Sequence, residues 1–214
     1  MQPIKSLLVL SVLAIPAFAP ATAAAQPGGY YSSPPPSSQL PGGFHNRQGG
    51  LMFGVSLGLG AMSDQGGDIT CAGCDYNPMS GEISGHIGGF IGPRFALMGE
   101  AQANIQTIAS DTFTDTTLVQ SALMIAGQYW VTPQLWLKGG LGFANLQLQQ
   151  SDAFGVFAES KPDNGTAIMG AIGFELYSAR RMSVDLQGRL LNGSYKGLDN
   201  NITAASVGIG INWF

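Results

Sequence analysis

Strict alternation between apolar and small or polar residues is the feature that most constrains this chain of 214 residues. In the first alternating segment, the odd positions of 51–59 are Leu, Phe, Val, Leu and Leu, and the even positions of 52–60 are Met, Gly, Ser, Gly and Gly. The same split recurs in seven further segments, at 82–91, 95–106, 120–129, 135–143, 167–176, 183–190 and 206–213. A period of two over eight segments predicts β-strands that each carry one apolar face.

The two faces of these segments differ in charge. The apolar faces carry none, whereas the opposite faces, rich in Gly, Ala, Ser and Gln, carry Glu82, Glu100, Lys138, Glu175, Asp185 and Arg189. Only 10% of the chain is charged, against about 25% in an ordinary soluble domain. Because Lys or Arg at the bilayer midplane costs about 2–4 kcal/mol, charge-free apolar faces indicate contact with lipid. A soluble lipocalin-like barrel, with its apolar faces inside, is the alternative.

The connections between the segments alternate strictly between long and short. The long ones are Met62–Ser80, Ala109–Thr117, Gln149–Gly165 and Asn192–Asn201, and the short ones are Gly92–Arg94, Thr132–Gln134 and Ser178–Arg181. Outer-membrane barrels have short periplasmic turns and long external loops. The sequence therefore predicts an all-β, eight-stranded antiparallel transmembrane up-and-down barrel over residues 50–214, with both ends in the periplasm.

The N-terminal part of the chain is typical of an exported protein. Lys5 precedes an apolar run from Leu7 to Phe18, and small residues at 23–25 suit a cleavage site, so 1–25 is predicted to be a cleaved signal peptide. An uncleaved membrane helix is the alternative. Residues 26–49 are rich in Pro, Gly and Ser, which predicts a periplasmic linker or, alternatively, a proline motif that binds a partner.

The segment pattern, the signal and the final Trp213-Phe214 resemble the small outer-membrane barrels of Gram-negative bacteria, the OmpA, OmpX, OmpW and opacity-protein kind. The resemblance covers about residues 50–214. It implies an outer-membrane location, a monomer, contacts with membrane lipids and lipopolysaccharide, and a C-terminal strand recognised by the barrel assembly machinery. The chain departs from that pattern in two places, because Phe214 is one step out of the apolar phase and Asn212 occupies a position where an aromatic residue is usual.

Aromatic residues gather where the segments meet the short connections and the C-terminus. These residues are Tyr129, Trp130, Trp136, Tyr177, Trp213 and Phe214. Aromatic girdles flank the apolar band of outer-membrane barrels. The sequence therefore predicts that these six form a girdle at the periplasmic interface. Three core tryptophans grouped by chance are the alternative.

The charged face points into the predicted lumen. An eight-stranded barrel is only wide enough to be filled by its own side chains, and a buried charge must be paired. We therefore expect one network that joins the acids Glu82, Glu100, Glu175 and Asp185 to Lys138 and Arg189. Such a network would fill the barrel or, alternatively, line a narrow ion pathway.

Two short motifs could carry chemistry. Glu82, Ser84 and His86 share one strand face, but a nucleophilic site also needs an oxyanion motif, and none is visible, so no catalytic residue is predicted. Cys71 and Cys74 lie in the first long loop without the strand and helix pattern of a redox site, and nearby Asp68 and Asp75 suit a zinc thiolate site poorly. In an oxidising compartment they are predicted to form a disulfide. No metal or cofactor is expected.

The distribution of charge limits the function. The chain has a net charge of −4, which does not favour a nucleic-acid partner. The long loops are acidic, whereas the short turns carry Arg94, Arg180 and Arg181 and no acid. We expect a structural or surface-interaction barrel that supports the envelope or binds through its loops. A narrow channel or carrier of small hydrophobic molecules is the second hypothesis, and a lipid A-modifying enzyme is the third.

Overall fold

A computed structural model of the chain describes residues 50–64, 67–69, 79–110, 115–152, 155–159, 163–179, 181–197 and 201–214. The predicted signal peptide, the linker up to residue 49 and both cysteines lie outside these ranges. Among the described residues, no helix is long and apolar enough to cross a membrane.

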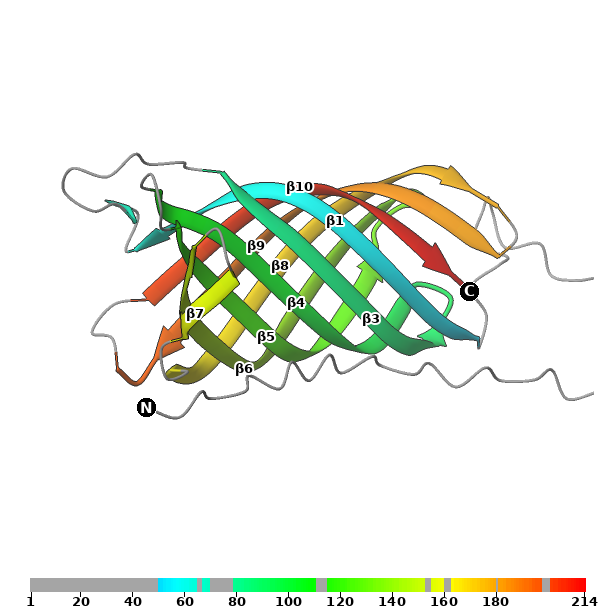
Figure 1. The fold of residues 1–214 in the computed structure, drawn as a ribbon. Coiled ribbons are helices and arrows are strands. Elements are labelled where there is room, and N and C mark those ends of the chain that lie inside the picture. The colour runs from blue at the N-terminus through cyan, green and yellow to red at the C-terminus, as the bar shows by residue number, and fades with distance from the viewer. Residues whose placement is uncertain are drawn as a thin grey trace, which may run out of the picture. The chain divides into compact units, whose positions relative to one another are not determined.

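Eight long strands form a closed barrel, as the alternation predicts (Figure 1). They are β1 (Leu51–Asp64), β3 (Ser80–Gly92), β4 (Phe95–Ser110), β5 (Asp115–Trp130), β6 (Leu135–Asp152), β8 (Asp163–Ser178), β9 (Met182–Tyr195) and β10 (Asn201–Trp213). Each pairs antiparallel with its neighbours in the sheet, and β10 closes the barrel on β1. Two short strands, β2 (Gly67–Asp68) and β7 (Gly155–Glu159), pair with the ends of β1 and β6.

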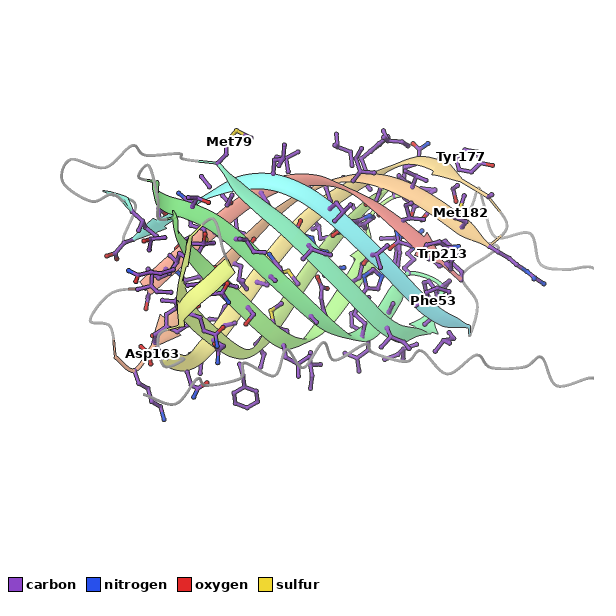
Figure 2. All side chains as sticks on the ribbon, in the orientation of Figure 1. Phe53, Met79, Asp163, Tyr177, Met182 and Trp213 are labelled. Atoms are coloured by element: carbon purple, nitrogen blue, oxygen red, sulfur yellow. The ribbon has the colours of Figure 1, made fainter. Side chains whose placement is uncertain are left out.

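The barrel has a short-turn end and a long-loop end. The short-turn end holds the connections 93–94, 131–134 and 179–181, the start of β1 and the C-terminus, and the long-loop end holds β2 and β7. Figure 2 shows Phe53, Tyr177 and Trp213 at the short-turn end and Met79 and Asp163 at the other. Several strands continue into the predicted long connections, because backbone pairing persists where the side chains no longer alternate.

The strands are staggered around the barrel. From Gly54, the paired residues run strand by strand through β3, β4, β5, β6, β8, β9 and β10 and return to β1 at Asp64, ten residues further on (64 − 54 = 10). Closing a sheet requires such a shear, which tilts every strand against the barrel axis. Residues that are paired in the ladder therefore lie at different heights in the barrel.

The two strand faces separate as predicted, with the apolar face outside. Large apolar side chains such as Leu57, Leu141 and Phe143 are more than 60% exposed on the outer wall, while the alternate positions are buried in the interior. Soluble monomers rarely expose continuous apolar patches larger than a few hundred Å². The barrel therefore has the inside-out arrangement of a protein surrounded by lipid, and not that of a lipocalin.

A candidate functional site inside the barrel

The barrel interior brings the predicted charged residues together. Glu82, Glu100, Lys138, Glu175, Asp185 and Arg189 are each 5% exposed or less. They occupy inward positions because each lies in the phase opposite to the exposed apolar side chains of its strand. The interior therefore holds four carboxyl groups and two basic side chains away from water.

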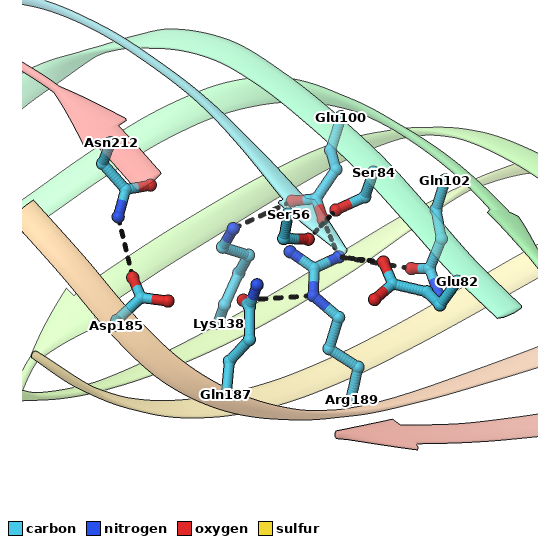
Figure 3. Close-up of polar contacts among 10 residues, drawn as sticks. All are labelled: Ser56, Glu82, Ser84, Glu100, Gln102, Lys138, Asp185, Gln187, Arg189 and Asn212. Atoms are coloured by element: carbon cyan, nitrogen blue, oxygen red, sulfur yellow. Dashed lines mark hydrogen bonds and ion pairs between the residues drawn. The ribbon is translucent and has the colours of Figure 1, made fainter. Parts of the chain in front are cut away.

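Glu100 on β4 lies at the centre of this interior. Its Oε2 is 3.1 Å from Lys138 Nζ on β6, and its Oε1 accepts a hydrogen bond from Arg189 Nη1 on β9 (Figure 3). Arg189 Nη1 also lies 3.8 Å from Glu82 Oε1 on β3. We call Glu82, Glu100, Lys138 and Arg189 the central network. It links four strands, and breaking a buried pair by removing one partner is strongly destabilising.

Neutral side chains complete the surroundings of both cations. Arg189 donates from Nε to Gln187 Oε1 at 3.2 Å and from Nη1 to Gln102 Oε1 at 3.4 Å. Lys138 Nζ lies 5.3 Å from the ring centroid of Trp136, within the range of a cation–π contact. The cations are therefore held by several partners each, as buried charges require.

Glu175 and Asp185 lie nearer the short-turn end, where they face each other across β8 and β9. Glu175 Oε1 accepts a hydrogen bond from the indole Nε1 of Trp130 at 2.8 Å. Asp185 Oδ2 accepts one from Asn212 Nδ2 at 2.7 Å. These two acids thus accept hydrogen bonds from neutral donors nearer the short-turn end, and the predicted single network of all six charged residues stays a prediction.

The Glu82, Ser84 and His86 arrangement lacks the contact that nucleophilic catalysis needs. Ser84 Oγ lies 2.5 Å from Ser56 Oγ, and the His86 Nε2 atom has no hydrogen-bond partner among the described residues. The seryl hydroxyl is therefore not bonded to the imidazole that would act as its base. In the described part of the chain, no group of three or more His, Cys, Asp or Glu side chains could hold a metal ion.

Side chains crowd the inner wall at the level of these charges. A Cβ atom added to Gly54, Gly58 or Gly210 would lie only 2.5–2.7 Å from a polar atom of a neighbouring side chain. Such contacts are shorter than any ordinary van der Waals separation. No space as large as a methyl group remains over these three inward positions.

Comparison with known proteins identifies the fold. No protein-family model and no curated protein matches the chain. Among solved structures, Ail, the attachment invasion locus protein of Yersinia pestis, is 12% identical with a TM-score of 0.50 over 75% of this chain and 97% of that one. Neisserial surface protein A is 12% identical with a TM-score of 0.51 over 76% and 96%.

This chain has the fold of the small eight-stranded outer-membrane barrels. A second structure of Ail, in complex with the heparin analogue sucrose octasulfate, gives a TM-score of 0.51 at 12% identity over 77% of this chain and 98% of that one. At this level of identity the likeness concerns the fold alone.

Within the outer-membrane barrel fold, the predicted aromatic girdle is wrong for two tryptophans. Trp130 and Trp136 are 0% and 1% exposed and lie inside the barrel. They occupy inward phases of β5 and β6, and strand phase decides the direction of a side chain whatever its distance from the strand end. Gly173 makes room for Trp136, because a Cβ there would lie 2.1 Å from the indole Cζ2.

The remaining predicted girdle residues divide between the outer wall and the barrel mouth. Tyr129 and Tyr177 are exposed outside, and Trp213 stacks on Phe53 with ring centroids 5.1 Å apart. Phe214 instead packs in the mouth of the barrel, 5.7 Å from the ring of Phe90.

Phe90 and Trp130 complete a cluster at the short-turn end that the sequence analysis missed. Their ring centroids are 5.4 Å apart, and we call Phe90, Trp130 and Phe214 the mouth cluster. The signal that could have revealed it is the inward phase of all three residues, which also explains why Phe214 departs from the apolar phase of β10. Asn212 shares that phase and therefore bonds Asp185 inside.

Proposed function

We propose that this chain is an integral protein of the bacterial outer membrane with a structural or surface-interaction role. The signal peptide at 1–25 would be cleaved on export, the short-turn end would face the periplasm and the long loops would face outward. The charge-free outer wall, the even number of strands and the fold support this placement.

The observation that carries the proposed role is the filled interior. The central network lies in the barrel interior, and the mouth cluster lies at its short-turn end. A carrier or channel needs a continuous space, whereas a structural barrel needs a rigid wall that presents its loops. This arrangement favours the structural or surface-interaction role over a narrow channel or a carrier of small hydrophobic molecules.

The proposed partners follow from the placement. They are outer-membrane lipids and lipopolysaccharide around the wall, and the barrel assembly machinery at the C-terminal strand, with the barrel acting as a monomer. The acidic long loops suit divalent cations shared with anionic lipopolysaccharide, because Ca²⁺ prefers several carboxylate oxygens. A lipid A-modifying activity is not proposed, because Ser84 bonds Ser56 and not His86.

Single-channel recording on the refolded full chain tests this role. A filled barrel is expected to add no steady conductance to a planar bilayer. Steady, resolved channels would overturn the structural role and put the narrow channel in its place.

Mass spectrometry of lipid A from a deletion strain tests the enzymatic alternative, and unchanged lipid A is expected.

A further inference from the structure

Two grooves lie next to each other on the outer wall, one over β1, β10, β9 and β8 and the other over β1 and β10. Their volumes are about 520 and 500 Å³, and both are lined by Leu59 and Val207, which are direct cross-strand partners. This pair forms a ridge between the two grooves. The grooves are therefore adjacent and of nearly equal size, which suits the two acyl chains of one lipid molecule.

The floor of the first groove is formed by residues with little or no side chain. Gly170 on β8, Gly188 on β9 and Ala205 on β10 lie between the larger Ile172 and Leu190. A Cβ added to Gly170 would meet no atom within 4 Å, and one added to Gly188 would meet only Ile172 Cγ2, at 3.9 Å. These positions are open to whatever surrounds the barrel.

An exposed cation and an aromatic pair lie toward the short-turn end of the barrel. Arg181 is exposed, and its carbonyl oxygen accepts a hydrogen bond from Phe214 N at 3.1 Å, so it lies beside the end of β10. Trp213, stacked on Phe53, comes next. The second groove begins at Ile211, two residues further along β10.

The spacing matches one leaflet of a bilayer. Seven residues separate Arg181 from Gly188 (188 − 181 = 7), which is about 23 Å along a strand. A tilt of 35–45° reduces this to about 16–19 Å along the membrane normal. Half of a hydrocarbon core is about 15 Å, so a headgroup at Arg181 would bring the ends of its acyl chains to the first groove, near the middle of the bilayer.

We propose that this wall binds one anionic phospholipid of the inner leaflet, with its phosphate at Arg181, its glycerol region at Trp213 and its two acyl chains in the grooves. The site rests on the proposed periplasmic orientation of the short turns. The ligand is anionic because two of the three turns at 93–94, 131–134 and 179–181 contain arginine and none of them contains an acidic residue.

Tryptophan fluorescence provides a direct readout of this wall. Trp213 is on the outside, whereas Trp130 and Trp136 are buried in the barrel, so quenching by lipids brominated on their acyl chains reports on Trp213. The refolded full chain would be placed in phosphatidylcholine bilayers, and brominated phosphatidylglycerol would be compared with brominated phosphatidylcholine. We expect an apparent affinity about five-fold higher for phosphatidylglycerol, since one basic residue near the surface contributes about 1 kcal/mol.

Two matched pairs of variants locate the headgroup and the chains. Arg181→Gln should abolish the preference, while Arg94→Gln, at an exposed arginine of the β3–β4 turn, should keep it. Gly188→Leu, which fills the groove, should weaken quenching by phosphatidylglycerol, while Gly99→Leu on the outer face of β4 should not. Arg180 stays unchanged in every variant.

The outcomes separate this site from the proposed function. Equal quenching by both lipids in the wild type, or equal losses in Arg181→Gln and Arg94→Gln, would overturn the lipid site while the membrane placement stands. Failure of the wild-type chain to insert into bilayers at all would overturn the placement, and the site with it.

Discussion

Glu100 fixes three strands through one carboxylate. Its two oxygens bind different cations, Lys138 from β6 and Arg189 from β9. The charge of a buried carboxylate is compensated while both cationic partners are present. Removal of one partner leaves part of that charge uncompensated in the interior. The stability of the barrel should therefore depend on each basic residue of the central network.

Lys138→Met is expected to lower the urea unfolding midpoint clearly. The change keeps a linear side chain but leaves Glu100 with one cation fewer, and breaking a buried pair in this way costs about 3–5 kcal/mol. Lys196→Met, at an exposed lysine of the long-loop end, is the control and should change little. Equal midpoints for the two variants would show that the interior is solvated and would favour an ion pathway.

The disulfide between Cys71 and Cys74 remains a prediction, because both residues lie outside the described part of the chain. We expect protein extracted under alkylation to carry no label on either cysteine without reduction, and label on both after reduction. Two labelled thiols in the unreduced protein would exclude the disulfide. The bond closes a very short loop, so it should add little to the stability of the barrel.

At the scale of the strands, β6 and β8 pair a residue that has a large side chain with a glycine, which has none. Trp136 and Gly173 are direct cross-strand partners, and the indole covers the glycine inside the barrel. Gly170, three residues earlier on β8, faces outward and meets nothing within 4 Å of an added Cβ. The two glycines of one strand thus serve different purposes, and substitution separates them.

Gly173→Ala is expected to destabilise the barrel by about 1–3 kcal/mol, because the new methyl group displaces the indole of Trp136. Gly170→Ala should be neutral or stabilise by up to about 1 kcal/mol through the unfolded state. Urea unfolding followed by tryptophan fluorescence measures both. If the two variants unfold at the same midpoint, Trp136 does not rest on Gly173.

Alternation predicted the existence, number and facing of the strands, but not their ends. β5 begins at Asp115 and β6 extends to Asp152, where polar residues occupy both faces. Backbone pairing continues there without an apolar face to mark it. The misplaced girdle has a related cause, since the phase of Trp130 and Trp136 decides the direction of their side chains, whereas nearness to a turn does not.

At the scale of the whole molecule, the stagger of ten residues decides which charges meet. Lys138 and Glu100 are not partners in the ladder, because Lys138 pairs with Gln128 and Glu100 with Met124. Their contact depends on the tilt that the stagger imposes. Sequence periodicity determines which face a residue occupies, but it contains no information on stagger. The interior location of all six charged residues was therefore predictable, whereas the contacts of Glu100 with Lys138 and Arg189 were not.

The closed barrel should also change the migration of the protein in gel electrophoresis. We expect the mature chain in the outer-membrane fraction, and a shift in gel migration between unheated and boiled samples, because a barrel without free edges resists detergent until it is heated. Boiling the Lys138→Met variant should complete the shift at a lower temperature. Recovery of the chain as a soluble periplasmic protein would contradict the membrane placement.

The docking of Phe214 on Phe90 sets an order of events in biogenesis. Phe214 lies 124 positions after Phe90 in the chain (214 − 90 = 124), directly after β10. Every intermediate that lacks the final strand therefore leaves the ring of Phe90 uncovered at that rim. An unfinished barrel therefore exposes this ring together with the unpaired edges of β1 and β9, and a chaperone or protease that inspects immature barrels could bind there.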